Sequence, residues 1–189
     1  KKDILNIVYL SNFYGLGEVA DYWNQVVLIN NWTRHRISKI IVNKLFGTVS
    51  GKKLSILGFS FKANTNDTRE SSAIQICKNL LEEGAELVIY DPKVSYEKIE
   101  EDLMLKEKVI SNDILSEGSW SKANTIEEAA ERSDAIIVLT EWDEFKYLDW
   151  EKISTLMRKP SWLFDTRNIS NYKKAAENGI NIWLLGSSD

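Results

Sequence analysis

From residue 52 onward, apolar runs alternate with amphipathic stretches along the chain. Apolar runs predict strands over residues 54–59, 86–90, 135–140, 162–164 and 180–185. Three- and four-residue periodicity predicts helices over residues 71–83, 96–102, 141–145, 149–158 and 171–178, with another beginning at Thr125. The stretch 104–122 has no assignable pattern. This alternation predicts an α/β fold, a doubly wound, mostly parallel, Rossmann-like sheet.

The N-terminal part is helical throughout. Apolar periodicity predicts one helix over residues 4–14 and a long one over 18–46, with Gly47 as its stop. Such a helix is about 40 Å long, which exceeds the width of a small domain. We therefore predict that it packs against something outside its own domain, although packing over its own sheet remains the alternative.

The chain divides accordingly into a helical segment, residues 1–47, and a Rossmann-like domain, residues 48–189. Its 189 residues carry a net charge of −4, which argues against nucleic-acid binding. No apolar run approaches the length of a membrane span, and no signal peptide is present. One cysteine fits a reducing cytoplasm, and one histidine beside it argues against a zinc site.

The loop after the first strand carries the clearest candidate chemistry. Lys62 and Arg69 flank it, and a helix is predicted to begin near Thr68, with Asp67 or Thr68 as its cap. Asp67 and Glu70 have the spacing of a capping box. Two cations beside a helix N-terminus suit a phosphate group, so the loop is a candidate phosphate-binding site. The alternative interpretation is an ordinary loop whose charges are only solvated. There is no Gly-x-Gly-x-x-Gly cradle for a dinucleotide.

Two further residues follow predicted strands. Arg167 should reach the same sheet edge as Lys62 and Arg69, so that three cations converge there. Asp91 ends the second strand where nucleotide folds place a ribose-binding acid, although Asp91-Pro92 could equally terminate the strand.

Cys77 and His35 are the remaining reactive residue types. Cys77 lies on the apolar stripe of its helix and is predicted to be core packing, since burial makes a thiol inert. His35 has no serine or carboxylate at catalytic spacing, and a solvated or interface position is expected.

Four ordered motifs resemble the UDP-glucose 6-dehydrogenase family. They are the stretches 58–71 (Gly-Phe-Ser-Phe-Lys through Thr-Arg-Glu-Ser), 90–93, 140–145 and 164–168. The resemblance spans essentially the whole of this chain, including the long helix. It covers only the C-terminal part of the family's enzyme. It implies oxidation of UDP-glucose to UDP-glucuronate in two steps that consume two NAD, through a cysteine thioester.

The resemblance extends to the first residues. Lys1-Lys2-Asp3 is similar to the end of the family's Gly-x-Cys-Phe-x-Lys-Asp motif, which places the cysteine two residues before Lys1 and the NAD-binding domain further upstream. The chain is therefore expected to be a fragment that cannot turn over. By the same resemblance, Lys2 stabilises developing oxyanions and Asp3 orients or deprotonates the hydrolytic water.

The resemblance also assigns binding residues. Phe61, Lys62 and Arg167 correspond to residues that contact the UDP-sugar, and Arg69 to one that reaches NAD. The family more often has glycine at the position of Thr166, which affects the expected sugar preference.

The resemblance implies a homodimer or higher oligomer built by the long helix. Two alternatives stay open. One is another nucleotide-sugar dehydrogenase, acting on UDP-N-acetylhexosamine or GDP-mannose. The other is a non-catalytic nucleotide-binding or oligomerisation module.

Overall fold

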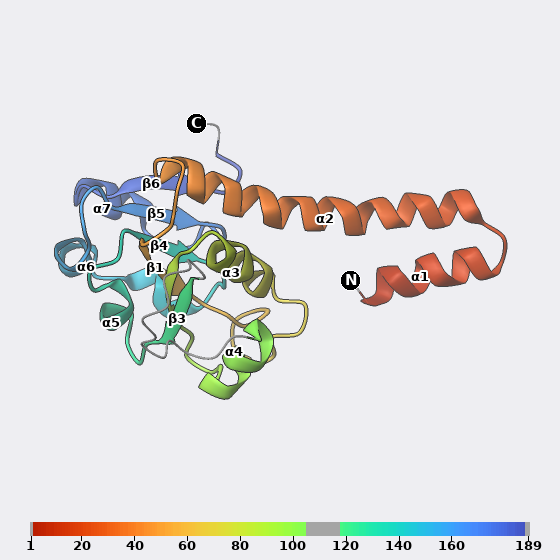
Figure 1. Ribbon diagram of the computed structural model, residues 1–189, viewed down its shortest axis with the longest axis horizontal. Helices are drawn as coiled ribbons and strands as arrows, with labels where there is room; N and C mark the ends of the chain where they lie inside the picture. Colours follow the sequence, from red (N-terminus) through yellow and green to blue (C-terminus); the bar gives the residue numbers. More distant parts are fainter. Residues whose placement is uncertain (1, 105–117, 188–189) are drawn as a thin grey trace.

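The structure is a computed structural model that describes residues 2–104 and 118–187. Its centre is a six-stranded sheet in which every pairing of neighbouring strands is parallel (Figure 1). The strands are β1 (Lys53–Leu57), β2 (Glu86–Tyr90), β3 (Ser119–Lys122), β4 (Ala135–Val138), β5 (Trp162–Asp165) and β6 (Asn181–Leu184). The expected α/β, doubly wound, Rossmann-like fold is confirmed.

The strands lie in the order β3-β2-β1-β4-β5-β6. The chain therefore builds one half of the sheet outward from β1 and then returns to build the other half outward from β4. Loops diverge where the order reverses, so the carboxyl ends of β1 and β4 flank the crevice in which such sheets bind ligands.

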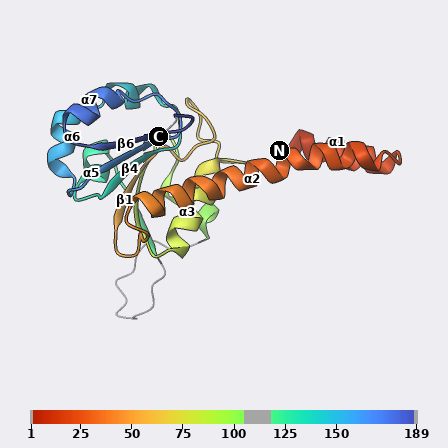
Figure 2. The ribbon, with the colours of Figure 1, turned by 90° about the horizontal axis from the view of Figure 1, so that it is seen from above.

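Helices cover both faces of the sheet (Figures 1 and 2). One face packs under the C-terminal half of α2, with α3 and α4; the other packs under α5, α6 and α7. The described helices are α1 (Lys2–Phe13), α2 (Gly17–Lys44), α3 (Ser72–Glu82), α4 (Tyr96–Leu103), α5 (Ile126–Ala130), the 3₁₀ helix η1 (Asp143–Tyr147), α6 (Trp150–Leu156) and α7 (Tyr172–Glu177).

Helices α1 and α2 form a long hairpin that projects from the domain (Figure 2). Ile37, Ile41 and Leu45 of α2 and its C-terminal turn are buried in the domain core. The outer part of α2 pairs with α1, which runs back so that its N-terminal end returns toward the domain (Figure 1). None of the helices within the described part of the chain is long and apolar enough to cross a membrane.

The helix predicted over residues 71–83 is α3, which begins at Ser72. The start near Thr68, suggested by the cap-like residues of the loop, is wrong, because the N-cap is Ser71, whose side chain accepts a hydrogen bond from Ala73 N. The Asp67 carboxylate instead accepts hydrogen bonds from Arg69 within the loop. A capping box with Glu70 is therefore absent, because Glu70 has a left-handed backbone (φ 63°) and stands outside the helix.

Two other predictions need correction. Residues 119–122, expected to be irregular, form β3, which pairs with β2 at the sheet edge; residues 105–117 of that stretch lie outside the described residues. The strand was missed because Trp120 is its one buried residue, and a single apolar position gives no alternation of apolar and polar residues. The helix expected over 141–145 is a 3₁₀ turn over Asp143–Tyr147.

Candidate functional site

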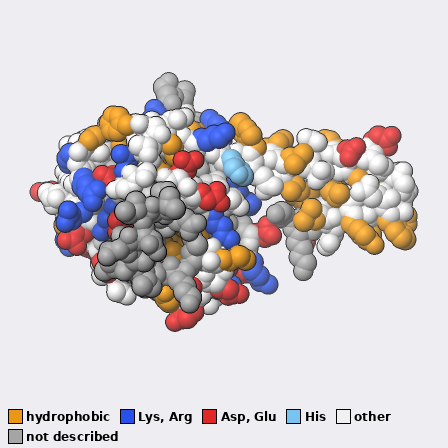
Figure 3. Space-filling view, viewed as in Figure 1, with side chains coloured by type: hydrophobic (Ala, Val, Ile, Leu, Met, Phe, Trp, Pro, Cys, Tyr) orange, Lys and Arg blue, Asp and Glu red, His pale blue; other side chains and the backbone are white. Residues whose placement is uncertain are grey.

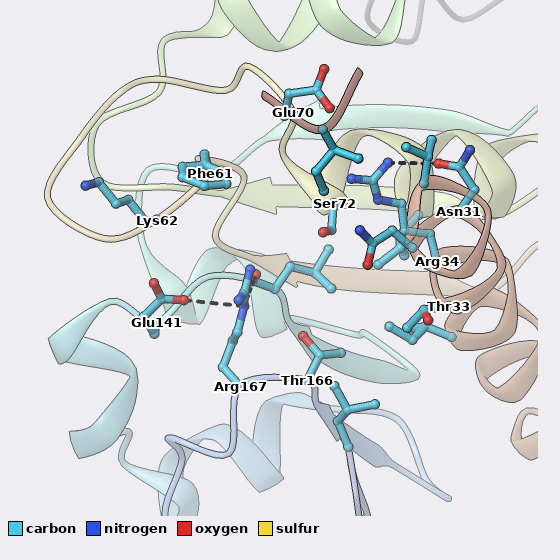
Figure 4. Close-up of a pocket in the computed structure, with 17 residues that line it drawn as sticks. Asn31, Thr33, Arg34, Phe61, Lys62, Glu70, Ser72, Glu141, Thr166 and Arg167 are labelled. Carbon is cyan, nitrogen blue, oxygen red and sulfur yellow. Dashed lines mark hydrogen bonds and ion pairs between the residues drawn. The ribbon is translucent and has the colours of Figure 1, made fainter. Parts of the chain in front are cut away.

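A pocket of about 510 Å³ lies between the helical hairpin and the carboxyl edge of the sheet (Figure 4). It is large enough for a nucleotide-sized ligand. Its walls come from the hairpin on one side and from the segments after β1, β4 and β5 on the other. The lining includes Ile4, Asn31, Arg34, Phe61, Lys62, Glu70, Ser72, Glu141, Thr166 and Arg167.

The structure brings together two of the three cations predicted to converge. Lys62 and Arg167 both line the pocket, although they are 105 residues apart in the chain. Arg69 does not line it. Its side chain is 85% exposed, and its guanidinium forms an ion pair with Asp67 at 2.7 Å. Hydrogen bonds from Arg69 lower the pKa of the Asp67 carboxyl to about 2.

Arg167 is held in place by its own strand edge. Its Nε donates a 2.8 Å hydrogen bond to the carbonyl oxygen of Leu139, and the Glu141 carboxylate lies 3.4 Å from the same nitrogen. Neither Nη atom donates a hydrogen bond to a described residue. The guanidinium therefore keeps the end that best matches phosphate geometry available to a ligand.

The loop carrying Arg167 is shaped by a buried carboxylate. Asp165 accepts hydrogen bonds from the backbone N–H groups of Arg167, Ile169 and Ser170 at 2.8–3.0 Å. Thr166 donates from Oγ1 to the carbonyl oxygen of Val138 at 2.7 Å. Thr166 is not among the residues with a positive φ, so its backbone does not require the glycine that the family more often has there.

Lys62 and Phe61 lie on the loop after β1. Phe61 N donates to the carbonyl oxygen of Asp67 at 2.8 Å, which closes the loop, and Ser60 Oγ donates to the carbonyl oxygen of Lys62 at 3.1 Å. No described residue forms a hydrogen bond or ion pair with Lys62 Nζ. Phe61 is half exposed (50%) and offers an apolar ring to the pocket.

The Asp91 carboxylate is engaged by the protein itself, which favours the structural alternative over a ribose contact. Its Oδ2 accepts from Phe59 N, Ser60 N and Ser60 Oγ at 2.7–3.0 Å and from Trp142 Nε1 at 3.2 Å. Its Oδ1 accepts from the backbone of Lys93 and Val94. The carboxylate is buried and its acceptor sites are filled, so it binds together three of the sequence motifs.

Gly58 directly follows β1 at a point of close packing. A Cβ built there would lie 2.4 Å from Thr140 Cβ, and the backbone φ is +90°. The glycine thus makes room for Thr140, whose Oγ1 donates to the carbonyl oxygen of Ser60 at 2.7 Å. That space is filled by protein, so these residues do not form a phosphate cradle of the dinucleotide kind.

Helix α1 reaches the pocket near its N-terminal end. Ile4 lines it, and Asp3, the preceding residue, is exposed. Lys2 begins α1, and its side chain is outside what the structure describes.

Arg34 is a pocket residue that the sequence reasoning missed. It comes from α2 and shares the pocket with Lys62 and Arg167. Its position on a helix gave no motif by which to recognise it. The neighbouring His35 bonds through Nδ1 to the carbonyl oxygen of Asn31.

Cys77 is fully buried, and this burial raises the pKa of its thiol, which agrees with the predicted packing role. Within residues 2–104 and 118–187, no cluster of three His, Cys, Asp or Glu side chains could hold a metal ion.

Together, the strand order and the cation-lined pocket at the switch point define a Rossmann-like domain built to bind a ligand at the carboxyl edge of its sheet. Residues 55–172 match the UDP-binding domain of the UDP-glucose/GDP-mannose dehydrogenase family. The chain belongs to that family.

Curated relatives agree with this assignment. UDP-glucose 6-dehydrogenase 4 of Arabidopsis thaliana is 45% identical, over 98% of this chain and 40% of that protein. UDP-glucose 6-dehydrogenase of Drosophila melanogaster is 41% identical, over 98% of this chain and 39% of that protein. The chain thus spans about 40% of the length of these relatives.

Solved structures share the fold. A UDP-glucose dehydrogenase from Pyrobaculum islandicum superposes with a TM-score of 0.66 at 23% identity, over 96% of this chain and 36% of that one. A UDP-D-ManNAc dehydrogenase from Pyrococcus horikoshii gives a TM-score of 0.61 at 24% identity, over 91% of this chain and 34% of that one.

Proposed function

We propose that this chain is the UDP-sugar-binding part of an NAD-dependent UDP-glucose 6-dehydrogenase, which oxidises UDP-glucose to UDP-glucuronate. The observation that carries the proposal is the pocket, in which Lys62 and Arg167 meet from separate loops with donors free for an anion. Sequence identity of 45% to a UDP-glucose 6-dehydrogenase over nearly the whole chain supports the choice of sugar nucleotide.

In this proposal, Lys62 and the Arg167 guanidinium hold the diphosphate, since charge-assisted hydrogen bonds are the stronger ones. Phe61 packs against the apolar part of the ligand. Lys2 and Asp3 act at the sugar end, the first on developing negative charge and the second on the attacking water. Their neighbour Ile4 lines the same pocket, which supports this assignment.

The parent enzyme, we propose, uses NAD as the hydride acceptor. The end of β1 offers no glycine cradle for a dinucleotide, because the space at Gly58 is filled by Thr140. NAD would therefore be held mainly by other parts of the enzyme, with the exposed Arg69 as one contact. On its own, this chain should bind the sugar nucleotide without oxidising it.

We also propose that the α1–α2 hairpin forms a homodimer or a larger homo-oligomer. Large apolar side chains cover its projecting part (Figure 3). Those at least half exposed are Tyr9, Leu10, Phe13, Tyr14, Leu16, Tyr22, Leu28, Ile29 and Trp32. Exposed apolar surface of this extent marks an interaction site.

Isothermal titration calorimetry of this chain with UDP-glucose and UDP tests the binding proposal. We expect weak binding, because only one wall of the enzyme's cleft is present. Lys62→Ala should weaken it by about tenfold or more, whereas Lys173→Ala, an exposed lysine on α7, should leave it unchanged. No heat and no thermal shift at millimolar UDP would overturn the proposal.

The identity of the sugar needs the whole enzyme. NADH formation with UDP-glucose, UDP-N-acetylhexosamines and GDP-mannose should be fastest with UDP-glucose. Faster NADH formation with a UDP-N-acetylhexosamine or with GDP-mannose would change the proposed substrate but not the family assignment.

A further inference from the structure

Arg34 is a partly buried cation that forms no ion pair with any residue the structure describes. It lies in the middle of α2 and is partly buried against the domain. Its one side-chain hydrogen bond to a described residue is a long contact of 3.4 Å from Nη1 to Asn31 Oδ1. No carboxylate of the described residues lies within ion-pair distance of it. A partly buried guanidinium without a counter-ion is costly unless a ligand supplies one.

The guanidinium points into the pocket already described. Figure 4 shows Arg34 directed from α2 toward Ser72, with Arg167 entering the same pocket from the loop after β5. Ser72 is the first residue of α3, an eleven-residue helix, so unpaired N–H groups of the helix start lie nearby. The helix N-terminus and Arg34 both favour negative charge on that side of the pocket, which also holds the Glu70 carboxylate at its rim, not paired with Arg34.

Arg167 and Lys62 therefore do not account for all the positive charge that the pocket offers. The carboxylate nearest to Arg167, Glu141, is turned toward the Nε side of that arginine and leaves Arg34 unpaired. A ligand with a single phosphate could satisfy the cations after β1 and β5. A diphosphate carries enough charge and length to engage Arg34 as well.

We infer that Arg34 is a third phosphate-binding residue of this site, so that helix α2 completes the diphosphate contact. This inference rests on the proposed binding of a UDP-sugar. It assigns to the long helix a role in ligand recognition in addition to any role in self-association.

Arg36 provides a matched control two residues along the same helix. It carries the same charge, but its guanidinium lies over the ring of Trp32, 5.7 Å from the ring centre, and it does not line the pocket. The variants Arg34→Gln and Arg36→Gln thus each remove one charge from the same turn of α2 but from different faces of the helix. Circular dichroism and the thermal midpoint check that both variants fold.

Calorimetry with UDP and with UMP gives the readout. Arg34→Gln should weaken UDP binding by about tenfold or more, and it should weaken UMP binding less. Arg34→Lys should recover part of the loss, and Arg36→Gln should bind UDP as the native chain does. A merely structural role for Arg34 would lower affinity for UDP and UMP equally.

Equal UDP affinities for Arg34→Gln and Arg36→Gln would overturn the inference, and so would an equal loss for UDP and UMP. If Lys62→Ala weakens UDP binding while Arg34→Gln does not, the proposed function stands and only the role of Arg34 fails. If the native chain does not bind UDP, both fail.

Discussion

The Nε atom of Arg167 donates a 2.8 Å hydrogen bond to the carbonyl oxygen of Leu139. This contact joins the loops that follow two adjacent strands, β5 and β4. It fixes the arginine stem at the sheet edge while both Nη atoms remain available. A guanidinium fixed in this way loses little conformational entropy when it binds a phosphate.

Arg167→Gln should therefore weaken UDP binding by about tenfold or more, since a charge-assisted contact is lost. The UDP affinity of Arg167→Lys should lie between those of the native chain and Arg167→Gln, because lysine keeps the charge but lacks Nε and the planar guanidinium. Calorimetry with UDP measures both. The control is Arg158→Gln at the amino edge of the sheet, where Arg158 pairs with Asp134 at 3.1 Å. Native affinity in Arg167→Gln would remove this residue from the site.

Asp91→Ala should destabilise the fold by at least about 3 kcal/mol, because several buried donors lose their acceptor and each costs about 1–3 kcal/mol. Asp91→Asn keeps one oxygen and should lose less. Urea unfolding measures both, with Asp21→Ala on the exposed face of α2 as the control. Lower UDP affinity at unchanged stability would instead point to a ribose ligand.

Gly58→Ala should cost more stability than Gly47→Ala. Both glycines have a positive φ, +90° and +78°, but only the Cβ at Gly58 meets another residue. Backbone strain should cost about 1–3 kcal/mol in each variant. The clash with Thr140 should add about 1–3 kcal/mol at Gly58. Urea unfolding measures both variants. Equal losses of stability in Gly58→Ala and Gly47→Ala would show that Thr140 moves aside without cost.

The pair Tyr9→Ser/Phe13→Ser should shift the chain toward a monomer, because it removes two stacked, largely exposed rings from the hairpin (68% and 70%). Sedimentation velocity measures the mass. Tyr147→Ser removes an even more exposed ring (84%) from the domain and should leave self-association unchanged. A native chain that sediments as a monomer would contradict the proposed oligomer.

Arg69→Gln should raise the pKa of the Asp67 carboxyl from about 2 toward its ordinary value. Since the folded pKa is lowered, the loop is stabilised above the ordinary aspartate pKa of about 3.9 and loses that stabilisation as pH falls toward the folded value. NMR titration of the carboxyl carbon measures the shift. Arg158→Gln, which is distant, should not change the Asp67 titration.

The hydrophobic pattern was sufficient for the sheet and most of its helices, because strands buried on both faces leave continuous apolar runs. It missed β3, an edge strand with one buried apolar residue. It predicted α3 to within one residue at each end. The cap-like residues of the preceding polar loop suggested a start near Thr68 instead, because such a loop offers several possible caps and only packing selects Ser71.

The sequence by itself determined the Rossmann-like fold, the motifs after β1, β4 and β5, and the placement of Lys62 and Arg167 at one edge, since parallel strands bring their carboxyl ends together. Only the tertiary structure decided which side chains enter the pocket. Arg69 pairs with Asp67 outside the pocket, and Arg34 enters the pocket from a distant helix. Asp91 accepts hydrogen bonds from backbone and side-chain donors of the protein. These outcomes depend on docking and hydrogen bonding between segments far apart in sequence, which no local pattern encodes.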